Sequence, residues 1–142
     1  MTSREVKKNI ETCLEDAEWH LEIAEKSIEM DAPNRITINS CIMSLIRGTD
    51  CLCWLHNGER CDTGRGHSLH KVFTELYNKD GLPEEYSKYS DTLRKWVSTE
   101  KVKAQYQGQT YSQSDLDRAI KQTRRYLDKC VKPVLRENEA ID

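Results

Sequence analysis

Apolar residues recur every three or four positions from residue 3 to residue 30, which is the spacing that places side chains on one face of an α-helix. The repeat consists of Val6, Ile10, Cys13, Leu14, Ala17, Leu21, Ala24 and Ile28. Pro33 follows at once and cannot continue a helix. The pattern therefore predicts one long helix that ends just before this proline.

A second helix is expected from about Thr37 to Leu55, before the Asn57-Gly58 pair that favours a turn. Its apolar face consists of Ile38, Cys41, Ile42, Leu45, Thr49 and Leu52, and few charges interrupt it. Because so little of this segment is charged, we expect it to be the most buried helix.

Three further helices follow in the pattern. One is expected over residues 67–78, and another begins at Pro83 and fades around residue 100. The last is the clearest: Ser112 with Asp115 three residues later is a helix-start signal. Behind it runs an apolar stripe of Leu116, Ala119, Ile120, Thr123, Leu127, Cys130, Val131 and Val134.

Neither the alternating pattern of β-strands nor an internal repeat is visible in the sequence. The chain is therefore predicted to be all-α, an up-and-down antiparallel bundle of about five helices in one domain over residues 1–142. We expect the first, second and fifth helices to form most of its core.

Charge is balanced overall but segregated by helix. The net charge of −2 predicts no general attraction to nucleic acid. The first helix carries an acidic ridge of Glu11, Glu15, Glu18, Glu22, Glu25 and Glu29, and the fifth carries a basic ridge of Arg118, Lys121, Arg125, Lys129, Lys132 and Arg136. Both are typical of solvated helix faces. Alternatively, the basic ridge binds phosphates while the acidic ridge repels nucleic acid or docks a basic partner.

Neither a signal peptide nor an apolar run long enough for a membrane span is found, so we expect a cytoplasmic protein that does not bind membranes. In that compartment the six cysteines are expected to be reduced thiols, most of them in the core.

Zinc-ligand residue types gather between positions 51 and 70, namely Cys51, Cys53, His56, Cys61, His67 and His70. If Cys51 and Cys53 are helical, however, they point about 200° apart and cannot hold one ion. Cysteine pairs with zinc-ribbon spacing are also lacking. We therefore predict no metal site and no cofactor.

The junction before the last helix is the candidate nucleotide or RNA site. Lys101, Lys103, Tyr106 and Arg118 surround the turn there, and Lys121 and Arg125 continue the positive charge along the helix. The free amides of a helix start attract phosphate. Two observations oppose this site: Asp115 and Asp117 lie in the same first turn, and Tyr106 and Tyr111 can simply pack the corner.

The order of these features resembles the HEPN family of helical-bundle proteins. The resemblance rests on the long first helix, the uncharged second helix TINSCIMSLIRGTDCLCWL, the opening GRGHSLHKVF and the junction KVKAQYQGQTYSQSDLDRAIKQTRRYLDKCV. In the junction, the places of the family's pattern are occupied by Lys101, Ala104, Tyr106, Ser112, Ala119 and Tyr126-Leu127. The similarity covers residues 3 to about 135.

The resemblance implies a homodimer, often encoded beside a nucleotidyltransferase or acting in toxin-antitoxin systems. Many relatives are metal-independent ribonucleases that use an Arg-x4-6-His motif in the fourth-to-fifth helix region. This chain departs from them, because no histidine follows His70 and Lys101 replaces the arginine. A formal match, Arg65-x4-His70, lies at the start of the third helix instead, and the same window also contains Arg60-x6-His67.

Three functions therefore remain open. The first is a non-catalytic nucleotide- or RNA-binding HEPN-like protein, and the second is an active ribonuclease using Arg65, His67 or His70. The third is a protein–protein interaction module such as an antitoxin or adaptor. Trp19 and Ile23 form a second apolar patch on the first helix, which a second subunit could cover.

Overall fold

The computed structural model describes residues 3–59, 69–80, 84–100 and 110–142. Within these ranges the chain is almost wholly helical and forms no strand, which confirms the predicted all-α bundle. The elements in order are α1 (Ser3–Glu29), α2 (Asn34–Asn57), α3 (Leu69–Asp80), η2 (Glu84–Tyr86), α4 (Lys88–Leu93), η3 (Arg94–Glu100), α6 (Gln113–Tyr126), η4 (Leu127–Val131) and α7 (Lys132–Glu137).

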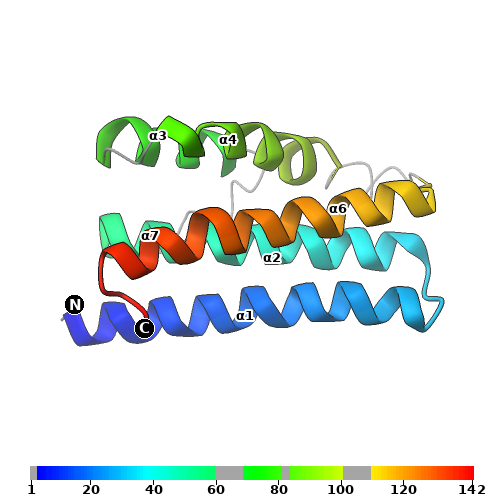
Figure 1. The fold of residues 1–142 in the computed structure, drawn as a ribbon, viewed down its shortest axis with the longest axis horizontal. Coiled ribbons are helices and arrows are strands. Elements are labelled where there is room, and N and C mark those ends of the chain that lie inside the picture. Colours follow the sequence, from blue (N-terminus) through cyan, green and yellow to red (C-terminus); the bar gives the residue numbers. More distant parts are fainter. Residues whose placement is uncertain (1–2, 60–68, 81–83, 101–109) are drawn as a thin grey trace.

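Figure 1 shows these helices in three layers. Helix α1 lies on one side, α2 lies with α6 and α7 in the middle, and α3 and α4 cover the other side. Because the middle layer is covered on both sides, α2 buries side chains around most of its circumference, including Ile38, Leu45 and Leu52. The prediction that the second helix is the most buried is confirmed.

The helix ends follow the predicted local signals. Gly58 ends α2 with a positive φ of 69°, a conformation that suits glycine, and its amide donates to the Trp54 carbonyl at 3.1 Å. At the start of α6, the Ser112 hydroxyl accepts from the Asp115 amide at 3.2 Å, and the Asp115 carboxylate accepts from the Ser112 amide at 2.9 Å. The predicted capping signal is thus confirmed.

The last helix is continuous but not uniform. Between α6 and α7, the five residues of η4 form a wider π-helical turn, where the sequence predicted an unbroken α-helix. Pro133 lies just beyond this turn and has no amide hydrogen for the carbonyl four residues earlier. A wider turn next to such a residue is one way for a helix to accommodate the missing bond.

Small residues on α2 allow unusually close contact with its neighbours. The Ser44 hydroxyl donates to the backbone carbonyl of Ala17 on α1 at 2.7 Å. On another side of α2, a Cβ atom at Gly48 would lie only 2.7 Å from Cδ2 of Leu127 in η4. Close packing on both sides therefore depends on small side chains at these positions.

Helix α1 exposes apolar side chains away from the core. Trp19 is 57% exposed and Ile23 45%, which confirms the predicted second apolar patch, and Met30, one residue after α1 ends, is 78% exposed. We call these three residues the α1 apolar patch. Among the helices that the structure describes, none is both long and apolar enough to cross a membrane.

Candidate functional site

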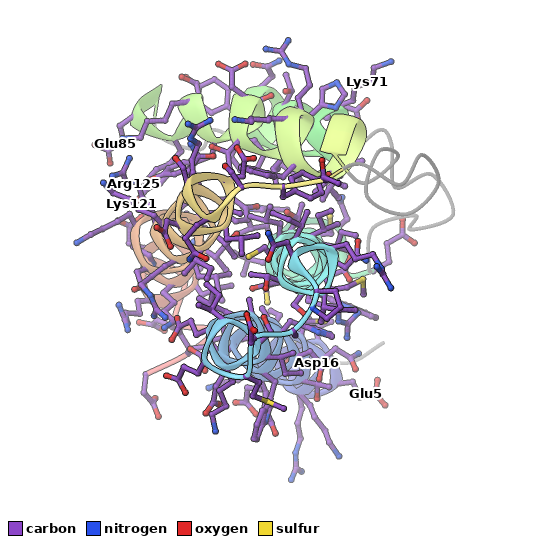
Figure 2. The ribbon with its side chains drawn as sticks, turned by 90° about the vertical axis from the view of Figure 1, so that its right-hand side faces the viewer. Glu5, Asp16, Lys71, Glu85, Lys121 and Arg125 are labelled. Atoms are coloured by element: carbon purple, nitrogen blue, oxygen red, sulfur yellow. The ribbon has the colours of Figure 1, made fainter. Side chains whose placement is uncertain are left out.

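A groove of about 350 Å³ lies between the last helix and the segment formed by η2 and α4. One wall is formed by Arg125 of α6 and Lys129 of η4. The facing wall is formed by Glu85, Tyr86, Lys88 and Tyr89. Figure 2 shows Glu85, Arg125 and Lys121 together at one edge of the molecule. We call this feature the basic groove.

Aromatic packing holds the two walls of the basic groove together. The rings of Tyr86 and Tyr89 lie 6.4 Å apart, and Tyr89 lies 5.7 Å from Tyr126 of the last helix. Tyr126 is fully buried and its hydroxyl shares a 2.7 Å hydrogen bond with Thr49 of α2. The floor of the groove is therefore continuous with the packed core.

Positive charge dominates the lining. Lys88, Arg125 and Lys129 contribute three cations, against the single carboxylate of Glu85. Lys88 also lies over the Tyr89 ring, with its Nζ 5.3 Å from the ring centroid. Burial is the main cause that raises the pKa of Tyr86 and of Tyr89, so neither phenol adds negative charge near neutral pH.

The basic ridge continues from the groove along α6. Arg118, Lys121, Arg125 and Lys129 are all exposed, as predicted. Within the part of the chain that the structure describes, none of these four makes an ion pair with a carboxylate. Cations that lack an ion-pair partner among the described residues suit phosphate binding.

Lys132, the fifth residue of the predicted ridge, does not face solvent alone. Its Nζ lies 2.8 Å from a Glu18 oxygen and 3.1 Å from an Asp128 oxygen. Burial alone would lower the pKa of Lys132, but its hydrogen bonds to these two carboxylates raise it. The prediction that Lys132 lies on the solvent-facing ridge is therefore wrong, because α1 packs beside this stretch of the last helix.

The acidic ridge is also engaged in part within the chain. Glu18 binds Lys132, and Glu25 pairs with Arg124 of α6. Glu22 pairs with Lys26 on α1 itself at 3.4 Å. The opposite charges of the first and last helices therefore form ion pairs where these helices pack. A basic partner would have to contact the acidic residues outside these pairs.

The junction before α6 supports packing more than anion binding in its described part. Lys101, Lys103 and Tyr106 lie outside the described residues. Tyr111 is buried, and its carbonyl accepts a hydrogen bond from the Asn34 side chain at 2.5 Å. The bond from the Ser112 amide lowers the pKa of the Asp115 carboxyl, so a negative charge already occupies the start of α6.

Of the histidines and the arginine proposed for a ribonuclease, only His70 is described, while Arg65 and His67 lie outside the described ranges. His70 is half-buried in the first turn of α3. Burial, assisted by the charges of Lys71 and Arg94, lowers the pKa of its imidazole. It is therefore neutral near pH 7 and able to accept a proton.

Among the cysteines that the structure describes, one differs from expectation. Cys13, Cys41, Cys51 and Cys130 are buried free thiols, whereas Cys53 is disulfide-bonded. The expectation that all six are reduced is thus wrong for Cys53. The described residues form no cluster of three or more metal-ligand side chains, and Cys61 and His67 lie outside them.

Sequence reasoning found one wall of the basic groove and missed the other. Arg125 was a candidate, and Lys129 belonged to the ridge. Tyr86 and Tyr89 fall within the helix expected from Pro83, and Lys88 lies between them in the sequence. An isolated lysine between two core tyrosines was the one signal available.

Comparison with known proteins identifies no matching family model, no matching curated protein and no matching solved structure.

Proposed function

We propose that this chain is a HEPN-like protein that binds a nucleotide or RNA through its phosphates and does not cleave it. The observation that carries the proposal is the basic groove, in which Lys88, Arg125 and Lys129 face one another across an aromatic floor. The order of helices and the junction motif support the family likeness, which remains part of the proposal.

The size of the groove and the cationic surface beyond its end favour a phosphate-bearing ligand. Its volume of about 350 Å³ falls within the range of small-molecule sites. Lys121 and Arg118 extend the cationic surface beyond one end, so a longer strand gains contacts that a mononucleotide lacks. The chain as a whole is slightly acidic, at −2, and binding must therefore be local to this face.

Fluorescence anisotropy of a labelled single-stranded RNA over a salt series tests this proposal. Substitution of alanine at Lys121, Arg125 and Lys129 together should abolish most of the affinity. The slope of the logarithm of the binding constant against the logarithm of the salt concentration should also become shallower by about 2. Each phosphate contact contributes roughly 0.7 to this slope for a single strand. Competition by mononucleotides would show whether the short ligand is sufficient.

A matched control removes the same charge elsewhere. Lys7, Lys8 and Lys71 are exposed on α1 and α3, and Figure 2 shows Lys71 well apart from Lys121 and Arg125. Alanine at these three positions should leave both affinity and salt slope unchanged. Equal losses of RNA affinity in the two triple variants would refute phosphate recognition by the groove, and so would a wild-type chain that binds no RNA. The protein–protein interaction module would then be the alternative.

A ribonuclease is the second candidate function, because His70 is kept neutral beside Arg94. A neutral imidazole can take the proton of a ribose hydroxyl near pH 7. Incubation with structured and unstructured RNA tests it: cleavage by the wild type but not by His70→Ala, at equal folded fraction, would establish the activity. Intact RNA with the wild type is the result expected from the binding proposal.

We further propose a homodimer that covers the α1 apolar patch of Trp19, Ile23 and Met30. Exposed apolar area of this kind is usually covered by a partner. Sedimentation should give about twice the 16.6 kDa chain mass, and Trp19→Asp should return it to one chain. A single-chain species at high concentration would contradict the dimer. A nucleotidyltransferase or antitoxin partner, and a cytoplasmic location, complete the family-based proposal.

A further inference from the structure

A pocket of about 570 Å³ lies where α1 begins, α2 ends and the segment after α7 folds back. Figure 1 shows these three parts of the chain at the same end of the bundle. The volume falls within the range of small-molecule sites and exceeds that of the basic groove. We call this feature the terminal pocket.

The walls of the terminal pocket are largely apolar. Ile10 of α1 and Ala140 of the C-terminal segment are buried, whereas Val6, Trp54 and Leu55 are only half-buried. Apolar side chains that are still partly in contact with water lose that contact when an apolar ligand enters, which favours binding. The walls therefore suit a hydrocarbon body.

The wall formed by the C-terminal segment includes a strained residue. Glu139 has a positive φ of 57°, at a helix end where glycine is usual. Its amide donates to the Arg136 carbonyl at 3.0 Å, and the Ala140 amide donates to the Leu135 carbonyl at 2.8 Å. This turn places Glu139 and Ala140 together in the pocket wall. Strain of this kind is concentrated at functional sites, so the turn supports a binding role.

The charged side chains of the pocket leave one positive charge in excess. Arg4 and Lys7 are exposed cations, and Glu139 is the carboxylate among the lining residues. In the part of the chain that the structure describes, none of these three forms an ion pair. A cation in the first turn of a helix opposes the helix dipole, so the stability of α1 does not account for Arg4. The charge complements one anionic group on a ligand.

We infer that the terminal pocket binds a free medium-chain fatty acid, with its carboxylate at Arg4 and Lys7 and its alkyl chain against the apolar wall around Trp54. A single carboxylate matches the excess of one positive charge, whereas a phosphate dianion would exceed it in the presence of Glu139. The limited volume favours a medium chain over a long one.

This site is distinct from the basic groove, because the residues that line the two features do not overlap. Fatty-acid binding and RNA binding can therefore succeed or fail independently, and each ligand should bind in the presence of the other.

Titration of the full chain with decanoate, below the concentration at which it forms micelles, tests the inference by two-dimensional NMR. The indole N–H signals of Trp19, Trp54 and Trp96 report three separate places and are assigned by single Trp→Phe variants. The Trp54 signal should shift and saturate, whereas those of Trp19, on the α1 apolar patch, and of Trp96, in the core, should not move. Octanoate should bind about tenfold more weakly, since each buried CH₂ is worth roughly a factor of four.

Charge variants test where the carboxylate lies. Alanine at Arg4 and Lys7 together should weaken decanoate binding at least about fivefold, whereas Glu139→Gln should strengthen it because a repelling charge is removed. The uncharged ligand 1-octanol should bind all these chains equally. The matched control, alanine at the exposed Lys8 and Lys71 outside the pocket, should leave decanoate affinity unchanged.

Circular dichroism confirms that each variant is folded, and Glu139→Gln provides the charge test if the double variant is not. A shift of Trp19 as large as that of Trp54 would overturn the inference, since decanoate would then bind apolar surface in general. A Trp54 signal that does not respond, or a decanoate affinity that is the same in all charge variants, would overturn it as well.

Discussion

Among substitutions that remove one charged side chain, replacement of Arg47 should destabilise the fold most. It joins α1 to α2, since its guanidinium binds Asp16 on the first helix and Asp50 on its own. The Asp50 side chain is fully buried, whereas 21% of the Arg47 side chain and 44% of the Asp16 side chain remain exposed. Replacement by methionine keeps much of the packing and removes the charge.

Most of the expected loss in the free energy of unfolding comes from the buried carboxylate of Asp50, which Arg47 binds. Removing one partner of a buried ion pair typically costs about 3–5 kcal/mol, because the other charge stays in the interior. Here water reaches part of Arg47, which places the value near the lower limit, about 3 kcal/mol. The half-exposed Asp16 contributes at most about 1 kcal/mol of this. Asp50→Asn in the same background should recover about 2 kcal/mol, because the buried side chain then carries no charge.

Urea unfolding followed by circular dichroism measures these values. The control is Arg94→Met, which breaks the 2.6 Å pair of Arg94 with Asp91, whose side chains are 62% and 75% exposed. That pair is shorter than the 2.9 Å pair with Asp50, yet its loss should cost below about 1 kcal/mol. Comparable losses for Arg47→Met and Arg94→Met would refute the assignment of stability to burial.

Three further outcomes are expected from the same measurement. Gly48→Ala should lose about 1 kcal/mol, since the new Cβ meets Leu127 at 2.7 Å and overpacking outweighs the gain in helix propensity. Ser112→Ala should lose about 1 kcal/mol with the cap, whereas Ser112→Asp should lose less. Burial raises the pKa of Cys41 and Cys130 to about 12 from 9.0, so the unfolded chain releases protons that the folded chain retains. Stability should then fall as the pH rises from 9 toward 12, and less steeply in a variant with alanine at both positions.

Much of the fold was predictable because its signals are local. The period of apolar residues sets the faces of α1 and α2, and Gly58 and Ser112 mark helix ends through their own backbone chemistry. The wider turn of η4 was not predicted. Its apolar pattern is indistinguishable from that of a regular helix, and Pro133 alone leaves several ways for the backbone to adjust.

The candidate site was only half predictable, for a different reason. A ridge of cations such as Lys121 and Arg125 is visible from helical spacing alone. Whether a given cation remains free depends on which helix packs beside it, and Lys132 is paired because α1 lies there. The facing wall with Lys88 comes from a segment about 40 residues earlier, whose placement only tertiary packing decides.

The wide turn in η4 also makes the number of residues before Pro133 critical. A π-helical turn holds one residue more than the α-helical turn it replaces, so the helix before it and the helix after it follow two different registers. Deletion of one residue from Leu127–Val131 would therefore convert the wide turn into an α-helical one and leave the buried Val134 and Leu135 on their present face. Insertion of one residue would instead turn the remainder by about 100° relative to α6 and take these two side chains out of the core. Homologous chains should therefore lose one residue from this segment more readily than they gain one.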